Sequence, residues 1–241
     1  MKAIILNSGI GKRMAPFTND NPKCLAKLNG HTILEHELEN LIHYNIKDII
    51  ITTGPFVEKI KQLIENKFPQ LNMIYVPNEK YDFTNYIYSI WLAKNFIDED
   101  IVLLHGDMVF EKELLGRLLD NPNKTCVLVN NKKELPQKDF KGRIERELVK
   151  EIGVDVFGEN AFFLLPVYKF SKEDFHSWLN EIGKFVEEGN INVYAENAFN
   201  QMENQFKLHP IYFGDEFCME IDDFDDLEIA KNYFKSKKQL P

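Results

Sequence analysis

Residues 2–14 read KAIILNSGIGKRM, and this stretch decides the fold. An apolar, β-rich run from Lys2 to Leu6 comes first, and a polar loop with two glycines follows it at once. Glycines directly after a first strand let backbone N–H groups approach a phosphate closely. The stretch therefore predicts a strand whose carboxyl end carries a ligand-binding loop.

Strands and helices alternate after this loop. Helical spacing of apolar residues follows Thr32, a plausible N-cap, over 33–42, and it recurs over 57–68 and 85–96. Further strands are predicted at 48–53, 73–76 and 101–104. Short loops between them imply crossover connections, so we predict an α/β fold with a Rossmann-like, mostly parallel central sheet flanked by helices. Ligands bind beyond the carboxyl ends of such strands, and the segments after each strand should line one crevice.

The second half of the chain is less regular. We predict strands at 126–129, 162–167 and 219–221, a helix after the N-cap Ser171, a helix over 194–206 and a last helix through 227–234. The polar, Lys-rich segment from Asn130 to Arg143, including 132–143, is predicted to be an exposed excursion. We see no repeat or linker and expect a single domain over 1–241, with a nucleotide-binding half (1–125) and an acceptor-binding half (126–241).

Composition excludes several classes of protein. The chain has 241 residues, 29 Lys+Arg and 38 Asp+Glu, and a net charge of −9, which argues against nucleic acid or an anionic membrane as main partner. No apolar run approaches the roughly 20 residues that span a bilayer, and the N-terminal apolar run is too short for a signal peptide. Cys24, Cys126 and Cys218 form neither a disulfide framework nor a zinc set, so we expect a cytoplasmic protein with reduced thiols.

Three cations gather in the first loop of this acidic protein. Lys12, Arg13 and Lys23 suggest a polyanionic ligand, although a lone pair of glycines with lysines is more often a solvated surface loop. The order Arg-Met-x-Pro followed by Pro-Lys favours a phosphate-binding loop over a solvated surface loop. A P-loop is absent, and Met14 stands where a dinucleotide fingerprint has a small residue, which disfavours a nicotinamide oxidoreductase.

Three carboxylates are candidates for a metal site. Asp107 follows an apolar strand, and Glu220 and Asp222 lie two apart on another predicted strand, so both point to one face. Most acidic residues are merely solvated, but acids that flank apolar strands are less easily explained in that way. Three oxygen ligands from two strand ends suit Mg²⁺.

The first loop also carries a family resemblance. The chain resembles the nucleotidyltransferases that make nucleoside diphosphate sugars and related activated compounds, on Gly9-x-Gly11-x-Arg13-Met14, Pro22-Lys23, Gly106-Asp107 and Glu220-Ile221-Asp222. It is most similar to the small phosphocholine cytidylyltransferases and their phosphonate and amino-acid-phosphate relatives, on Asn78-x-x-Tyr81-x-x-Thr84-Asn85-x-x-x-Ser89 and Tyr194-x-Glu196-Asn197.

The resemblance implies a reaction and roles for residues. An acceptor phosphate or phosphonate oxygen would attack the α-phosphorus of CTP and release pyrophosphate, with Mg²⁺ as cofactor. Catalytic roles fall to Arg13, which would hold the triphosphate, and to Lys23, which would contact the α-phosphate. Asp107 and Asp222 would be metal ligands, with Glu220 as a third member. Nucleotide binding is implied for Leu6, Asn7, Ser8, Gly9, Gly11, Lys12, Gly54, Asn85 and Ser89.

The acceptor is expected to bind at Tyr194, Glu196 and Asn197. A tyrosine–tryptophan–aspartate order in phosphocholine enzymes appears here as Tyr194-Ala195-Glu196, which removes one wall of an aromatic cage. A primary ammonium that donates to Glu196 therefore fits at least as well as trimethylammonium. The alternative is that Glu196 caps or packs its own helix.

Two other functions remain open at this point. Asn7-Ser8 replaces two small residues of the family, so a sugar-1-phosphate nucleotidyltransferase that uses UTP or dTTP is an alternative. A nucleotide-sensing domain without catalysis is the other. The expected partners are CTP and a small phospho- or phosphono-acceptor, with no nucleic acid and no membrane, in a monomer or homodimer.

Overall fold

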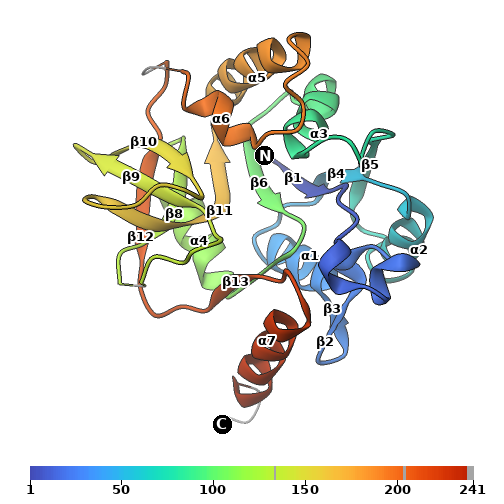
Figure 1. Cartoon of the computed structure of the whole chain (residues 1–241). Coiled ribbons are helices and arrows are strands. Elements are labelled where there is room, and N and C mark those ends of the chain that lie inside the picture. The colour runs from blue at the N-terminus through green and yellow to red at the C-terminus, as the bar shows by residue number, and fades with distance from the viewer. Residues whose placement is uncertain (133, 203–204, 238–241) are drawn as a thin grey trace.

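A computed structural model describes residues 1–132, 134–202 and 205–237 (Figure 1). Its strands are β1 (Lys2–Asn7), β2 (Lys27–Leu28), β3 (His31–Thr32), β4 (Asp48–Thr53), β5 (Asn72–Pro77), β6 (Ile101–His105), β7 (Met108–Phe110), β8 (Cys126–Asn130), β9 (Lys141–Glu145), β10 (Leu148–Gly153), β11 (Ala161–Phe170), β12 (His209–Phe213) and β13 (Cys218–Glu220). Its α-helices are α1 (Ile33–His43), α2 (Val57–Lys67), α3 (Tyr86–Ala93), α4 (Lys112–Asp120), α5 (Lys172–Glu187), α6 (Ala195–Phe199) and α7 (Phe224–Lys237). None of the described helices is both long and apolar enough to cross a bilayer.

Four strands from the first half form a parallel block in the order β5-β4-β1-β6. The chain winds outward from β1 through β4 to β5 and then returns to the other side of β1 as β6. The direction of winding therefore reverses between β1 and β6, which is where ligands bind in open α/β sheets. The predicted fold is confirmed in this block, and its carboxyl ends carry the first loop and Asp107.

Strands from the second half extend the same nine-stranded sheet, mostly in the antiparallel sense. Strand β11 runs antiparallel to β6, β8 and β9, and β12 is parallel to β8. A separate two-stranded ribbon pairs β13 with β7, opposing Glu220 to Met108. This ribbon brings the C-terminal part of the chain to the end of β6.

The core lies on both faces of the sheet. In β1, Ala3 and Ile5 pack into one apolar cluster with α1, α2 and α4, whereas Ile4 and Leu6 pack into another with α3, α5 and α6 (Figure 1). Burial on both faces explains why β1 reads as an unbroken apolar run rather than an alternating one.

Several local signals have the predicted role. Thr32 and Glu35 form a reciprocal capping box at the start of α1, and the Ser171 side chain accepts the Asp174 N–H at the start of α5. Each cap satisfies an N–H group that the first helical turn leaves without a partner. The strand predicted at 48–53 is β4, with the predicted bounds.

Two predictions in the second half were wrong in part. The helix predicted over 194–206 is limited to α6, and residues 203–204 lie outside the described ones. Beyond it, Asn200 directs its side chain to β10, where it bonds both the N–H and the C=O of Ile152, at 2.9 and 2.8 Å. The backbone N–H groups of Gln201 and Met202 donate to carbonyls three residues earlier, so the chain continues in turns after α6 while Asn200 ties it to β10.

The segment 130–143 is not a wholly exposed excursion. Asn130 closes β8 with 4% exposure, and Lys141 opens β9 with 0% exposure and donates to the Pro136 carbonyl at 2.8 Å. Lys132 and Lys138 are exposed as predicted, and residue 133 lies outside the described part. A strand can bury a lysine when its ammonium finds a carbonyl and its stem packs on apolar surface.

Candidate active site

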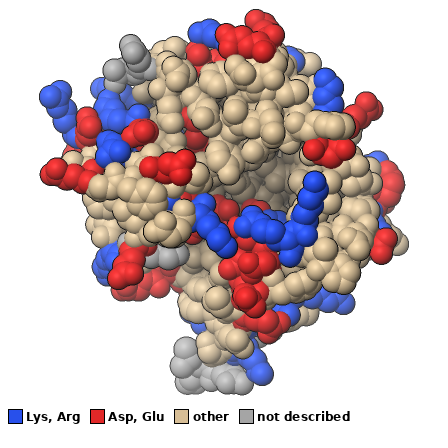
Figure 2. Space-filling model, in the orientation of Figure 1, with Lys and Arg blue, Asp and Glu red and all other residues tan. Residues whose placement is uncertain are grey.

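A cavity of about 180 Å³ lies at the carboxyl ends of β1 and β6, where the winding reverses. The space-filling view shows a hollow in the middle of this face, with Lys and Arg side chains on its lower rim and carboxylates directly below (Figure 2). The cavity is lined by Leu6, Asn7, Ser8, Gly9, Gly11, Lys23, Asn78, Tyr81, Thr84, Asn85, Tyr86, Ser89, His105, Gly106 and Asp107. Most of the predicted nucleotide-binding residues therefore meet in one place.

Glycines let the loop after β1 lie close to its neighbours. Gly11 has φ of 70°, a left-handed conformation, and an added Cβ there would lie 2.9 Å from the Lys23 Cβ. An added Cβ on Gly54 would lie 2.4 Å from the Ser8 carbonyl oxygen. Gly54 thus supports the loop from behind and is not among the residues that line the cavity. Lys12, also predicted to bind the nucleotide, does not line it either.

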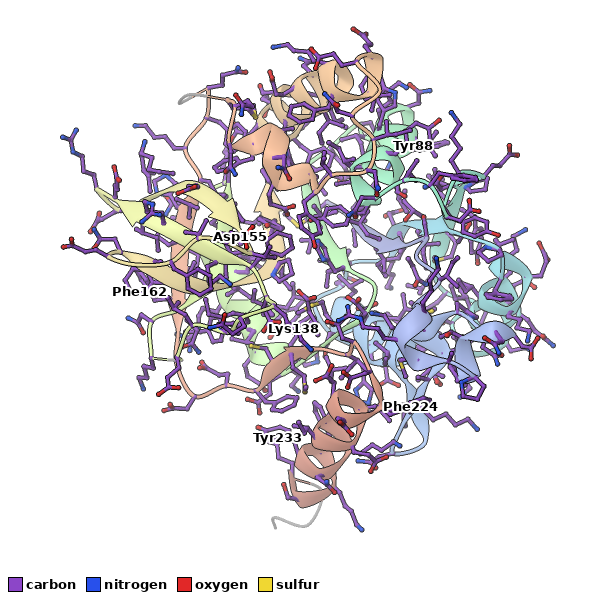
Figure 3. All side chains as sticks on the ribbon, viewed as in Figure 1. Tyr88, Lys138, Asp155, Phe162, Phe224 and Tyr233 are labelled. Carbon is purple, nitrogen blue, oxygen red and sulfur yellow. The ribbon has the colours of Figure 1, made fainter. Side chains whose placement is uncertain are left out.

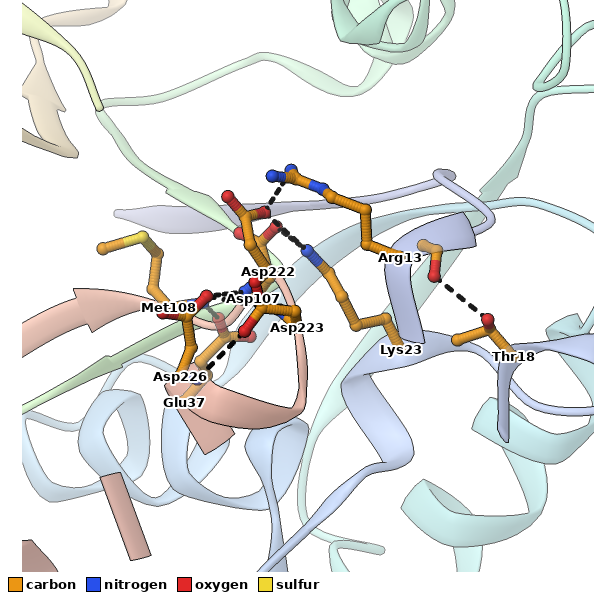
Figure 4. A network of polar contacts seen from close by, with 10 residues as sticks. Arg13, Thr18, Lys23, Glu37, Asp107, Met108, Asp222, Asp223 and Asp226 are labelled. Atoms are coloured by element: carbon orange, nitrogen blue, oxygen red, sulfur yellow. Dashed lines mark hydrogen bonds and ion pairs between the residues drawn. The ribbon is translucent and has the colours of Figure 1, made fainter. Parts of the chain in front are cut away.

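Asp107, Glu220 and Asp222 form one carboxylate cluster, with oxygen atoms within 4.8 Å of one another. The β7–β13 ribbon creates it, and the Ile221 N–H donates to the Asp107 carbonyl at 2.9 Å. Buried Glu37 on α1 accepts the Met108 N–H at 3.1 Å and holds the turn after Asp107 (Figure 4). The three acids that the sequence proposed for one metal site therefore lie side by side.

Two cations of the first loop contact this cluster (Figure 4). The Lys23 ammonium donates to Asp107 and lies 3.5 Å from Asp222 Oδ1, and the Arg13 guanidinium lies 2.6 Å from the same oxygen. Burial alone would raise the pKa of Asp107, but the charge of Lys23 outweighs burial and lowers it. For Glu220, burial and the charge of Asp107 both raise the pKa, well above its ordinary value.

The cluster fits a hard divalent cation. Asp107 Oδ1 and Glu220 Oε1 are buried, and within the described ranges no hydrogen-bond donor reaches either atom. Buried carboxylate oxygens without a donor are costly unless a cation accepts them as ligands. Oxygen donors are what Mg²⁺ prefers, with the remaining positions filled by phosphate and water.

Sequence reasoning assigned no binding role to six residues that line the cavity, namely Asn78, Tyr81, Thr84, Tyr86, His105 and Gly106. Four of them stand in the motifs of the family resemblance, whereas Tyr86 and His105 do not. Asn78 follows β5 directly, so its place at a strand's carboxyl end was a usable signal. Burial lowers the pKa of His105, whose ring packs 4.7 Å from that of Tyr86. Nothing local in the sequence marks Tyr86, because its position depends on how α3 packs.

A second cavity of about 500 Å³ adjoins the first in the second half, and Asn85 lines both. Tyr194, Glu196 and Asn197 line it together with Phe140, Glu151 and Asp155, and no Lys or Arg is among its described lining residues. Figure 3 labels Asp155 near the strands β9 to β11. Glu196 is 1% exposed and accepts hydrogen bonds from Tyr168, at 2.9 Å, and from Tyr86. It therefore links the second cavity to Tyr86 in the wall of the first, and among the described residues no side-chain bond caps α6. Its burial between the two tyrosines also fits the packing role that the sequence left open.

Residues 3–236 match the MobA-like NTP transferase domain family. The chain belongs to this family. The CMP-5'-(3-aminopropyl)phosphonate synthase of Streptomyces rubellomurinus is 30% identical over 146 residues, which are 61% of this chain and 23% of that protein. The CTP:phosphoglutamine cytidylyltransferase of Campylobacter jejuni is 26% identical, over 86% of this chain and 85% of that protein. The chain thus spans about a quarter of the first of these relatives and most of the second.

A solved structure has the same fold along nearly the whole chain. The CTP:phosphocholine cytidylyltransferase of Streptococcus pneumoniae superposes with a TM-score of 0.79 at 21% identity, covering 97% of this chain and 98% of that one. The predicted resemblance to the nucleotidyltransferase superfamily and the predicted α/β nucleotidyltransferase fold are both confirmed.

Proposed function

We propose that this protein transfers CMP from CTP to a small phosphate or phosphonate acceptor that carries an amine, and releases pyrophosphate. The observation that carries the proposal is the pair of adjoining cavities. The first has cations and a carboxylate cluster at one end, and the second is acidic and aromatic. The relatives named above make or use CMP and CTP compounds with phosphonate, phosphoglutamine or phosphocholine.

The chemistry requires positioning and charge stabilisation. An oxygen of the acceptor forms a bond to the α-phosphorus while the bond from this phosphorus to the bridging oxygen of pyrophosphate breaks. A phosphate monoester with a second pKa of about 6 is already ionised at pH 7, so no general base is needed. Lys23 would donate to the α-phosphate as negative charge moves toward the leaving group, and Arg13 would hold the leaving pyrophosphate.

Mg²⁺ would be held by Asp107 and Asp222, with Glu220 close by. Bound there, it would neutralise charge on the triphosphate and so lower the barrier to attack by an anionic acceptor. The present partners of Lys23 and Arg13 are these same carboxylates. Phosphate oxygens would take over the two donors when the nucleotide binds.

The acceptor pocket favours a cation. Asp155 and Glu196 would repel an acceptor whose only charge is its phosphate, whereas an ammonium group would compensate both. Glu151 already pairs with Arg143 at 2.9 Å. Phe140 and Tyr194, with ring centroids 5.1 Å apart, add faces that attract a cation. The 500 Å³ volume leaves room for an acceptor larger than choline, such as a phosphoamino acid.

The decisive experiment measures pyrophosphate release with each common NTP and with phosphocholine, phosphoethanolamine, aminoethylphosphonate, phosphoamino acids and a neutral sugar 1-phosphate. We expect turnover with CTP and an amine acceptor only. A higher rate with UTP or dTTP and the sugar phosphate would assign the chain to the sugar-nucleotide branch. Tight CTP binding without turnover on any acceptor would favour a nucleotide-sensing domain.

Amine recognition has its own test. Glu196→Gln and Asp155→Asn should each raise KM for the amine acceptor about tenfold while KM for CTP changes little, because each removes one charge-assisted contact. Glu145→Gln, on the exposed end of β9, is the matched control. An equal effect on every acceptor would mean that these carboxylates do not read the amine.

A further inference from the structure

Three buried side chains form a hydrogen-bonded row across the first cavity. Asn78 Nδ2 lies 3.1 Å from Ser89 Oγ, and Ser89 Oγ lies 3.1 Å from Ser8 Oγ. Their exposed fractions are 2%, 1% and 7%, respectively, so bulk water does not compete for their protons. The row joins the ends of β5 and β1 through α3, on the side of the cavity away from Asp107 at the end of β6.

The direction of this row is fixed at its Asn78 end. Asn78 Oδ1 accepts the Lys80 backbone N–H at 2.9 Å, and a backbone N–H can only donate. The amide nitrogen must therefore point the other way, and it donates to Thr84 Oγ1 at 2.9 Å and to Ser89. Both of its hydrogens are used.

Burial completes the assignment of protons along the row. Ser89 is 1% exposed and accepts from Asn78, and among its described contacts only the Ser8 oxygen can accept the Ser89 hydrogen, so Ser89 donates to Ser8. Ser8 accepts from Ser89, so its hydroxyl hydrogen is free to be donated to a ligand in the cavity that Ser8 lines. A serine hydroxyl is ordinarily ambivalent, donor or acceptor by rotation, but here the row makes it a donor.

We propose that the row Asn78–Ser89–Ser8 selects the base by presenting the Ser8 hydroxyl as a donor to N3 of cytosine. This proposal rests on the proposed use of CTP. N3 of cytosine is an acceptor, whereas N3 of uracil and thymine carries a hydrogen. A donor facing that hydrogen leaves two buried polar groups unpaired, which rejects the wrong base strongly. The alternative is that the row merely fastens α3 to the first loop.

Reversal of the row separates these two roles. In Asn78→Asp the carboxylate can only accept, so Ser89 would donate to it and would then accept from Ser8. Ser8 would present only lone pairs to the cavity, which suits the N3–H of uracil. If the row only held α3 to the first loop, Asn78→Asp would weaken the binding of every nucleotide but would not change the preference from CTP to UTP.

The test is the dissociation constant of CTP and of UTP, each with Mg²⁺ and without acceptor, measured by titration calorimetry. The wild type should bind CTP more tightly, and Asn78→Asp should shift the CTP-to-UTP ratio toward UTP by about 10- to 100-fold. Ser89→Ala should bring the ratio toward one without reversing it, because Ser8 can then rotate. Asn72→Asp, exposed at the start of β5 and outside the cavity, makes the same change of side chain and should keep the wild-type ratio.

The result that overturns the proposal is an unchanged ratio in both Asn78→Asp and Ser89→Ala, or a wild type that binds UTP as tightly as CTP. Thermal melting checks the fold of each variant. Where Asn78→Asp does not fold, the ratio in Ser89→Ala decides. Because binding is measured without an acceptor, CTP selection by this row with no pyrophosphate release would count against the proposed transfer reaction and not against the row.

Discussion

The two halves of the central sheet are stabilised in different ways. The block β5-β4-β1-β6 is parallel and buried on both faces, with helices α1, α2 and α3 between its strands. The part built from β8 to β12 is largely antiparallel and depends on side chains that bond distant backbone, such as Asn200 on Ile152 and Lys169 on the carbonyls of Leu119 and Asn121. Both halves contain such long-range bonds, for example Glu37 to the Met108 N–H, but in the first half the helices and strands also follow local sequence patterns closely.

The candidate site draws on both halves. Lys23, Arg13 and Asp107 belong to the first half, while Glu220, Asp222 and the acidic cavity belong to the second. Substitutions in one half should therefore affect a site that the other half shares.

Removing one carboxylate of the cluster from either half should abolish activity. We expect Asp107→Ala and Asp222→Ala each to bring pyrophosphate release from CTP to background, because the metal site needs ligands from both. Asp215→Ala, at a side chain 90% exposed, is the control and should retain full activity. Activity that persists in excess EDTA would contradict a metal site shared by the halves.

Lys23→Ala should reduce turnover by about 10²–10³-fold, the usual cost of losing one donor to developing charge. KM for CTP should change much less, because the ammonium matters most in the transition state. Lys27→Ala, exposed on β2, is the matched control. Steady-state kinetics measures both constants, and a loss confined to KM would assign Lys23 to binding alone.

Gly54→Ala should lower the free energy of unfolding by about 1–3 kcal/mol, since the new Cβ would lie 2.4 Å from the Ser8 carbonyl oxygen. Gly9→Ala, where nothing lies within 4 Å of the added Cβ, should change it by about 0.5 kcal/mol or less. Urea denaturation of the two variants gives the comparison. Equal stability would show that the parallel half tolerates movement of its first loop.

Asn200→Ala should cost about 0.5–1.5 kcal/mol of unfolding free energy, because two partly exposed side-chain bonds to Ile152 are lost. Hydrogen exchange of the Ile152 amide should increase in the variant, while amides of β1 and β4 keep their protection. Faster exchange in β1 or β4 would mean that the two halves unfold together.

Cys24 should be inert in the native protein. Burial raises its pKa to about 12, so the thiolate fraction is very small at pH 8 and remains small at pH 9. Asn7 Nδ2, 2.8 Å from the sulfur atom, lowers this pKa, but burial outweighs it. We expect no reaction with a thiol reagent until the chain is unfolded. Labelling of Cys24 under native conditions, detected by mass spectrometry, would indicate that the first loop opens.

The parallel half and the cationic loop after β1 could be predicted from local patterns in the sequence. The apolar run of β1, the capping box at Thr32 and the glycines at 9 and 11 act through neighbours in the chain, so their pattern is readable locally. Asp107 could be proposed because it follows an apolar predicted strand, and the family resemblance implied Asp222 as its partner. The separate β7–β13 ribbon, rather than the edge of the main sheet, brings the two together.

Only the tertiary structure decided which side chains meet across the chain. Glu196 accepts a hydrogen bond from Tyr86, 110 residues away, and Lys23 donates one to Asp107, 84 residues away. Ser8 accepts a hydrogen bond from Ser89. Lys141 became a buried strand residue for the same reason. The partner of a buried polar group is set by how helices and strands pack, and packing energy depends on the whole core rather than on adjacent residues.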